Sequence, residues 1–432
     1  MKNFYLSFAT GLLAMNLSAQ QSELHQVVIL NEGPFGGPVT VGSFNPTSKS
    51  YSSFDTINGR FASDVIIDNG FIYVAADSLI VKYDADTHQK TGEQTVMGVR
   101  EFAIWNDQLL VTRGDVGGLP SYFQAYDKNS LAFLYEINGI SDDAAEVKVV
   151  GDTAYIAVNG FGAVGKLAVV DLQNQSLNRE IDLGPDGLNP ENVELGKNGK
   201  IFTVNSLDWS NISVTKYDAN NATFTSKKLG VSGGCGASAL SHLGNIYFQQ
   251  GDNFNGNPEP LEKNLGVYDA QASLGFWDTL MIDKQIYGMG LDSVNGNIYV
   301  SGTDFSTYGK IYVYNFYGML SDSFNVGISP GTIAFDVRTT TGFNELPNSV
   351  FGMEISPNPT GGIFAIKFLN SESGEISIKN ILGETVFQSM VKPDISSYRI
   401  DLSFLPAGIY FILLKSEKGL ATEKVVKSGF NR

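Results

Sequence analysis

A short phrase recurs seven times between residues 40 and 316 of this chain. Each copy is an aromatic or aliphatic residue at the end of an apolar run, then Asp or Asn, then polar turn residues. The copies are Phe44-Asn45, Tyr83-Asp84, Tyr126-Asp127, Val170-Asp171, Tyr217-Asp218, Tyr268-Asp269 and Tyr314-Asn315. Successive copies are 39, 43, 44, 47, 51 and 46 residues apart. A repeat of this length indicates a β-propeller.

The residues between the copies predict β-hairpins. Runs such as 71–74, 154–157 and 298–300 are rich in β-branched and aromatic residues, which favour strands. Pairs such as Asn69-Gly70 and Asn295-Gly296 precede two of these runs, and such residues adopt the positive φ angles of hairpin turns at low cost. We therefore expect each repeat to form one four-stranded antiparallel blade.

The two ends of the repeat region predict how the ring closes. Residues 26–30 read as a strand in the middle of a blade, and residues 331–338 resemble the innermost strand that this first blade lacks. We expect an all-β chain with a seven-bladed β-propeller over residues 20–338, whose first blade is completed by both ends of that segment.

The composition agrees with an all-β chain. The sequence has 47 Gly and 12% aromatic residues, which suit many short strands and tight turns. Cys235 is the single cysteine, so no intramolecular disulfide is possible. We interpret Cys235, which lies between glycines, as a small buried residue, with a reactive thiol as the alternative.

The first 19 residues have the layout of a secretory signal peptide. Lys2 is followed by an apolar run over residues 4–17 and by Ser18-Ala19, which predicts cleavage before Gln20. The apolar run is too short for a membrane span, so we expect no transmembrane segment. No cysteine follows it, and we therefore expect no lipid anchor at this end.

The negative charge lies in the propeller region. The whole chain has a net charge of −16, whereas residues 352–432 hold 9 basic and 8 acidic residues, so the remainder carries about −17. Nucleic acids and anionic membranes require a basic face, and we expect neither as a partner. The charge is compatible with simple solubility and with cationic ligands.

The sequence contains no recognised catalytic or metal-binding motif. His25, His88 and His242 are widely spaced and fit no zinc, iron or copper motif. No nucleophile elbow, Walker loop or dinucleotide fingerprint occurs. The loop 252–257, which contains Asp252, lacks the ligand spacing of a dedicated calcium loop, which leaves calcium as a weaker alternative. We expect no catalytic residues, no bound metal and no cofactor.

One face of the predicted propeller is rich in aromatic and polar residues. The connection after the second strand of each blade should open on this face, and five of the seven carry an aromatic residue beside Gly, Asn or Asp. The candidate ligand-binding residues there are Asn31, Phe35, Phe161, Asp208, Trp209, Asp252, Phe254, Asp304, Phe305 and Tyr308. Flat aromatic area beside hydrogen-bonding groups favours a binding face. The alternative is that the aromatic side chains pack inward and brace Gly-rich loops.

A second polar group lies in the turns that enter the innermost strands. Arg60, Arg100, Asp142, Asn189 and Glu191 should lie near the mouth of the central channel. We include Arg60, Arg100 and Glu191 among the candidate ligand-binding residues, with solvation of the pore as the alternative.

The last 80 residues resemble a secretion signal domain. Three motifs occur in order, namely Pro357-Asn358-Pro359-Thr360-Gly361, Gly383-Glu384 and Ala407-Gly408-Ile409-Tyr410. This set resembles the type A sorting domain of the type IX secretion system of Bacteroidota. The resemblance implies an immunoglobulin-like sandwich, the type IX secretion machinery as a partner, and release or attachment at the outer cell surface. Its sorting-motif residues would be Pro357, Asn358, Pro359, Gly361, Gly408 and Tyr410.

The propeller region resembles a second family. The segments Ile29-Leu30-Asn31-Glu32-Gly33-Pro34-Phe35-Gly36 and Asn189-Pro190-Glu191-Asn192-Val193 are similar to motifs of the YVTN-type surface propellers of Bacteroidota. Some members of that family bind corrinoids at the cell surface and pass them to an outer-membrane transporter. Those corrinoid binders generally carry a lipid anchor, whereas this chain has a sorting domain.

These patterns predict a secreted or cell-surface, non-catalytic binding protein. One propeller face would hold an unknown extracellular ligand, which could be a small molecule, a glycan or a protein, with a corrinoid as the sharpest candidate. The alternatives are a rigid surface or matrix scaffold, and a propeller enzyme of the lactonase or lyase type with Asp142 or Glu191 as acid or base. The predicted boundaries are a signal peptide at 1–19, the propeller at 20–338, a linker at 339–351 and the sorting domain at 352–432.

Overall fold

The computed structural model has two compact units, which are treated separately. In the first unit the described residues are 21–207, 211–231, 239–242, 244–250, 264–270, 277–280, 282, 284, 286–316 and 318–340. In the second they are 353–368, 374–381, 383–391, 396–416 and 419–428. Strands dominate both units, and the first also contains the short 3-10 helices η1 (Gly160–Gly162) and η2 (Lys197–Gly199). Within these ranges no helix is long and apolar enough to cross a membrane.

The described part of the first unit forms seven four-stranded antiparallel sheets. From first to fourth strand, the first four sheets are β28 (Pro330–Thr340), β1 (Gln21–Asn31), β2 (Val39–Asn45) and β3 (Ser50–Ile57); β4 (Ala62–Asp68), β5 (Phe71–Ala76), β6 (Leu79–Asp84) and β7 (Lys90–Thr95); β8 (Val99–Trp105), β9 (Gln108–Arg113), β10 (Phe123–Asp127) and β11 (Phe133–Glu136); and β12 (Ala144–Val150), β13 (Thr153–Val158), β14 (Lys166–Asp171) and β15 (Ser176–Asp182). The other three are β16 (Pro190–Leu195), β17 (Lys200–Asn205), β18 (Ser213–Asp218) and β19 (Thr223–Lys228); β20 (Ala239–His242), β21 (Asn245–Gln249), β22 (Leu265–Asp269) and β23 (Trp277–Leu280); and β24 (Met289–Asp292), β25 (Asn297–Gly302), β26 (Tyr308–Asn315) and β27 (Leu320–Ile328).

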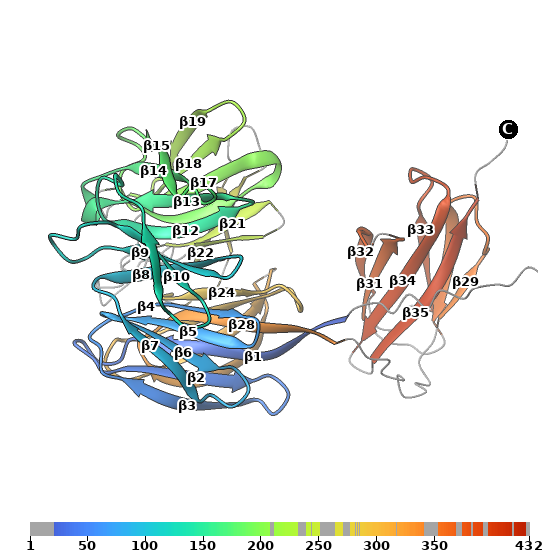
Figure 1. Ribbon diagram of the computed structural model, residues 1–432. Coiled ribbons are helices and arrows are strands. Elements are labelled where there is room, and N and C mark those ends of the chain that lie inside the picture. Colours follow the sequence, from blue (N-terminus) through green and yellow to red (C-terminus); the bar gives the residue numbers. More distant parts are fainter. Residues whose placement is uncertain are drawn as a thin grey trace, which may run out of the picture. The chain divides into compact units, whose positions relative to one another are not determined.

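The first strands of the sheets contact one another in a closed series. Contacts run from β4 through β8, β12, β16, β20 and β24 to β28, and β28 contacts β4 again. This places the seven first strands around a common axis, as in a propeller. The last strand of the unit, β28, pairs with β1 in register Val27↔Phe335 and Ile29↔Ile333, and Figure 1 shows the orange β28 beside the blue β1. The predicted joining of the two ends in one sheet is confirmed.

The hydrophobic core of the first unit lies between neighbouring sheets. Val28 and Val41 of the first sheet share one buried cluster with Ile72 and Val81 of the second. The second strands are buried on both faces, and a strand in that position requires a nearly continuous apolar run. The sequence of β5, Phe-Ile-Tyr-Val-Ala-Ala, has this character, whereas the outer strand β3 is mostly polar and exposed.

In the six sheets whose turn after the third strand is described, the repeated Asp or Asn closes that turn. Asp84 Oδ1 accepts hydrogen bonds from the backbone N–H groups of Asp86 and Thr87, at 3.1 and 2.8 Å. Asp127 and Asn45 hold their own turns in the same way. The phrase therefore repeats because each of these six turns needs one side-chain acceptor.

The second unit consists of two antiparallel sheets that share one core. One sheet has the order β29 (Met353–Ser356), β30 (Ile363–Phe368) and β33 (Ser397–Asp401), and the other β32 (Thr385–Val391), β31 (Gly374–Asn380), β34 (Gly408–Ser416) and β35 (Gly419–Lys427). Phe364 and Ile366 of the first sheet pack in the same buried cluster as Ile376, Ile378 and Ile412 of the second. Alternating inward residues of this kind are typical of a β-sandwich.

Some of the predicted sorting-motif residues fasten a loop to this sandwich. Asn358 donates to the carbonyl oxygen of Lys424 at 2.7 Å and accepts from the N–H of Val426 at 2.9 Å. Tyr410 is buried, and its hydroxyl donates to the carbonyl oxygen of Pro406 at 2.8 Å. Pro357, Pro359 and Gly361 lie in the same loop, and Gly408 is the first residue of β34. The peptide bonds that precede both prolines are cis.

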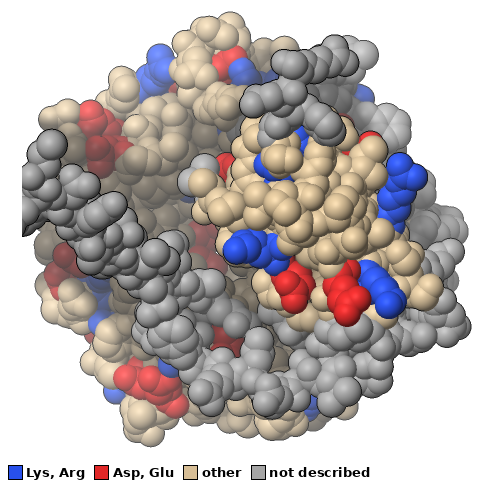
Figure 2. Space-filling view, turned by 90° about the vertical axis from the view of Figure 1, so that its right-hand side faces the viewer, with Lys and Arg blue, Asp and Glu red and all other residues tan. Residues whose placement is uncertain are grey.

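Charged side chains are interspersed on the face that Figure 2 shows. Asp and Glu lie at several separate places on that face, with Lys and Arg among them, and neither kind forms a continuous patch among its described residues.

Candidate functional site

Among the described strand pairings, five of the first strands carry a β-bulge near their start. In four of them the pairing register with the second strand shifts after Ala62, Val99, Ala144 and Pro190, and in β28 it shifts between Pro330 and Thr332. A bulge re-aims the side chains that follow it. The residues two positions after Ala62, Val99, Ala144, Pro190 and Pro330 occupy equivalent places in the five strands. They are Asp64, Glu101, Glu146, Asn192 and Thr332.

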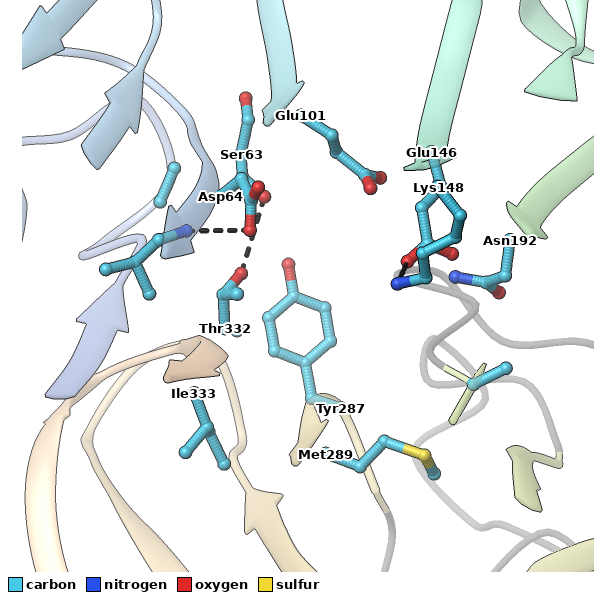
Figure 3. A pocket seen from close by; sticks show the side chains of 14 residues that line it. Ser63, Asp64, Glu101, Glu146, Lys148, Asn192, Tyr287, Met289, Thr332 and Ile333 are labelled. Carbon is cyan, nitrogen blue, oxygen red and sulfur yellow. Dashed lines mark hydrogen bonds and ion pairs between the residues drawn. The ribbon is translucent and has the colours of Figure 1, made fainter. Parts of the chain in front are cut away.

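These five side chains line a cavity of about 300 Å³ in the central channel. Every one of the seven first strands contributes to its wall, and Tyr287, which precedes β24, contributes as well. The other lining residues are Ala62, Ser63, Val65, Lys148, Ala239, Met289, Gly331 and Ile333. Figure 3 shows the side chains of Asp64, Glu101, Tyr287, Glu146 and Asn192 directed toward one common space. Most of these residues lie early in their strands, so the cavity occupies the half of the channel next to the rim from which the first strands start.

Two carboxyl groups in this cavity have raised pKa values. Burial raises the pKa of Asp64 to about 7, against the effect of hydrogen bonds from the N–H groups of Phe102 at 2.9 Å and Val65 at 2.8 Å. Burial also raises the pKa of Glu101 well above its usual range, and the nearby charges of Glu146 and Asp64 add to this shift. Both carboxyl groups are therefore easier to protonate than in water.

The third carboxylate of the cavity is already paired. Glu146 forms an ion pair with Lys148 and accepts a hydrogen bond from the N–H of Val193 at 2.8 Å. Burial alone would lower the pKa of Lys148, but the charges of Glu146 and Glu194 outweigh burial and raise it. Lys148 therefore stays protonated and is engaged by Glu146. Among the described residues, neither Asp64 nor Glu101 lies within ion-pair distance of a cationic side chain.

The channel mouth carries a network that joins three neighbouring sheets. Arg100 lies 3.3 Å from a carboxylate oxygen of Asp115 and 3.7 Å from one of Glu191. It also donates to Oδ1 of Asn159 at 3.3 Å, and Asn159 donates to Glu191 at 3.1 Å. Burial raises the pKa of Glu191, whereas Arg100 opposes the shift. The structure thus brings together two predicted site residues, Arg100 and Glu191.

Arg60, the third predicted residue of the mouth, lies in a separate pair. Its guanidinium group donates two hydrogen bonds to Asp77, at 3.2 and 3.1 Å. The side chain of Arg60 is largely exposed, and its positive charge is paired with the carboxylate of Asp77.

The predicted rim residues of the first sheet differ in exposure. Asn31 is fully buried, and its amide donates to the carbonyl oxygen of Thr40 at 3.2 Å and to the hydroxyl of Tyr51 at 3.0 Å. Phe35, in the following connection, is 98% exposed. Asn31 therefore braces the sheet, whereas Phe35 is presented to solvent.

The predicted rim residues around the start of β26 also differ in their surroundings. Phe305 packs its ring edge-on against Tyr287, with the ring centroids 5.0 Å apart, and so lies beside the cavity. Tyr308 is 79% exposed. Asp304 accepts hydrogen bonds from the N–H groups of Ser306 and Thr307, at 2.9 and 2.7 Å, and these bonds lower its pKa. Asp304 is thus engaged in its own turn.

The remaining predicted residues are not described. Phe161 belongs to η1, but its side chain is outside the description. Asp208, Trp209, Asp252 and Phe254 lie outside the described residues.

The sequence reasoning missed the cavity residues Asp64, Glu101, Glu146, Lys148 and Tyr287. A signal for three of them was present, because an acidic residue precedes an apolar one in Asp64-Val65, Glu101-Phe102 and Glu146-Val147. Aligning the repeats on their first strands would have placed these acids at one level of the channel. The repeated phrase, which is the most visible pattern in the sequence, marks the outer turns after the third strands and not the channel.

Comparison with known proteins identifies the second unit. Residues 354–428 match the family described as a secretion system C-terminal sorting domain. The chain thus carries a type IX secretion sorting domain, which implies export to the cell surface or the medium and the type IX machinery as a partner. No curated protein sequence matches the chain.

Solved structures support a propeller-like fold. Hydrazine synthase of Kuenenia stuttgartiensis is 15% identical with a TM-score of 0.53, and the alignment covers 65% of this chain and 96% of that one. A Bacteroides fragilis protein named after 6-phosphogluconolactonase is 11% identical with a TM-score of 0.51, over 72% and 98% of the two chains. A hypothetical selenium-binding protein of Sulfolobus tokodaii is 11% identical with a TM-score of 0.51, over 75% and 92%. At these identities the likeness concerns the fold alone.

Proposed function

We propose that this chain is a non-catalytic binding protein, exported by type IX secretion, whose propeller holds a ligand at the mouth of its channel. The observation that carries the proposal is the cavity to which each of the seven first strands contributes a wall. A concave site of a few hundred Å³ with convergent polar groups and perturbed pKa values is the usual place for a small ligand. In this chain the cavity combines all three features.

We further propose that the seven sheets are the blades of one closed YVTN-type propeller and that the second unit is an immunoglobulin-like sandwich. The closed series of first strands and the pairing of β1 with β28 support the ring. The two sheets that share a core support the sandwich. Residues 1–19, which lie outside the described part, would be the signal peptide.

The exposed rim side chains support a ligand that also contacts the face. Phe35 and Tyr308 are exposed at 98% and 79%, and large aromatic side chains in that state often mark binding surfaces. A corrinoid is the candidate that the YVTN resemblance offers. It is larger than the 300 Å³ cavity, so it would lie across the rim.

Equilibrium dialysis of cyanocobalamin against the full chain tests this proposal. We expect colour retained at one equivalent, and a loss of affinity of about tenfold or more in the variant with Phe35→Ser and Tyr308→Ser. Both positions are exposed, so this variant should remain folded. If neither the corrinoid nor any glycan on an array is retained, while crosslinking captures partner proteins, the rigid scaffold replaces the binding protein.

A propeller hydrolase or lyase is the second candidate. The observation that favours it is Asp64, whose pKa of about 7 would suit a general acid or base at neutral pH, in a cavity it shares with Glu101. Turnover of a lactone or glycan that is lost in Asp64→Asn would establish an enzyme in place of the binding protein.

A further inference from the structure

We propose that the channel cavity binds a small organic cation that carries a protonated amino group. This inference rests on the proposed binding function and names the chemical class of the ligand. Three observations support it, namely the charge of the cavity wall, the hydrogen-bond acceptors of its carboxyl groups, and the size of the space.

The charge of the wall is only partly balanced. Asp64, Glu101 and Glu146 come from three neighbouring first strands and line the same space. Lys148 balances Glu146, and its ammonium group is engaged there. Among the described residues, Asp64 and Glu101 form no ion pair. A cation in the cavity would relieve the mutual repulsion that contributes to the raised pKa values of these acids.

The acceptors in the wall match a hydrogen-bond donor as the ligand. The carboxyl groups of Asp64 and Glu101 are directed into the cavity, and a carboxylate only accepts hydrogen bonds. An ammonium group offers three donors and no acceptor, which matches a wall of carboxylates.

The geometry favours an organic cation over a bare metal ion. Within the described part of the chain, no three His, Cys, Asp or Glu side chains lie close enough together to hold a metal. The wall instead spreads its acceptors around a space of about 300 Å³ and includes the apolar side chains of Met289 and Ile333. The aromatic ring of Tyr287 in the same wall would add to the attraction for a cation. A ligand with a carbon body and one amino group fits such a wall.

Calorimetric titration of the full chain with matched pairs of small molecules tests this inference. Cyclohexylamine is compared with cyclohexanol, and putrescine with 1,4-butanediol, at pH 8, where both amines are protonated. We expect at least one amine to bind at one equivalent and its neutral partner to bind at least 100-fold more weakly, because the neutral compound leaves the carboxylates unpaired. Glu101→Gln should weaken the amine at least tenfold, whereas Glu23→Gln, the same change at an exposed position, should leave it unchanged.

The acidity of the wall adds a second readout. Protonation of Asp64 and Glu101 removes the charges that would hold the cation, so affinity in wild type should fall as the pH is lowered from 8 to 5.5. In Glu101→Gln this fall should be smaller. Far-ultraviolet circular dichroism of both variants verifies that they are folded.

Four results would overturn the inference. The first is no binding of either amine, the second is equal binding of amine and neutral partner, and the third is full affinity in folded Glu101→Gln. The fourth is binding of calcium, in the absence of any amine, that is lost in Glu101→Gln. That result would assign the cavity to a divalent cation. If the amines fail while cyanocobalamin is retained on the rim, the proposed function stands and only this inference is lost.

Discussion

The turn carboxylates of the repeat and the channel carboxylates of the cavity belong to the same sheets, yet their surroundings shift their pKa values in opposite directions. Backbone N–H groups of Thr87 and Ser130 lower the pKa values of Asp84 and Asp127 in the outer turns. In the channel, burial raises the pKa values of Asp64 and Glu101. A turn carboxylate therefore stabilises the fold in its charged form, whereas an unpaired channel carboxylate destabilises it. Residues that lower stability in a cavity are candidates for function.

Removal of the paired channel carboxylate should have the largest effect on stability. Glu146→Ala leaves Lys148 without its nearest anion and removes the acceptor of the N–H of Val193. We expect the free energy of unfolding in urea to fall by about 2 kcal/mol, since Glu146 is largely buried and its loss leaves both an ammonium group and a backbone N–H without their acceptor.

An exposed ion pair on an outer strand provides the matched control. Glu93→Ala breaks the pair of Glu93 with Lys90, both of which are about half exposed, and should change the free energy by less than about 0.5 kcal/mol. Equal losses in the two variants would contradict the distinction between channel and outer positions.

Removal of a turn acceptor should have a smaller effect. Asp84→Ala deletes the acceptor for Asp86 and Thr87, and we expect the Tm to fall by about 2–4 °C. Asp84→Asn keeps an acceptor oxygen, as Asn45 does at the equivalent turn of the first sheet, so its Tm should stay close to wild type. If the Asn variant melts as early as the Ala variant, the charge of Asp84 matters more than its hydrogen bonds.

The difference between turns and channel also explains what the sequence could predict. The turn aspartates act on residues two or three positions away, so their pattern is visible in a one-dimensional sequence as a repeated phrase. The hairpins were predictable for the same reason, because their turns are also local. No first strand precedes residues 26–30 in the first sheet, and this absence predicted the pairing of β1 with β28. The fold was therefore accessible from spacing and local turn chemistry.

The site was less accessible because it depends on contacts between distant residues. Asp64 binds the backbone of Phe102 in the next sheet, and Glu146 binds that of Val193. Which strand residues face the channel depends on the bulges, which shift the register by one position and leave no clear mark in composition. The position of Asn31 also depends on packing that the sequence does not show, since this polar residue, expected at the rim, is buried and donates to Thr40 and Tyr51.

The smallest expected effect is also the one that separates folding from function. Glu101 makes no ion pair within the described residues, and its pKa in the folded chain is raised above that of the unfolded chain. Between these two pKa values the folded state holds a proton that the unfolded state has lost, so stability falls as the pH rises through this range. Glu101→Gln removes this penalty. We expect its Tm to exceed that of wild type by about 1–2 °C at pH 8 and to equal it at pH 4, where Glu101 is protonated in wild type.

Differential scanning calorimetry of the ligand-free chain at the two pH values measures this difference, with Glu23→Gln as the control that should show none. A lower Tm for Glu101→Gln at pH 8 would mean that Glu101 supports the fold, as the turn aspartates do. A higher Tm together with weaker amine binding would show that the carboxylate lowers the stability of the ring and serves the ligand. This trade between stability and activity is the usual sign of a functional residue.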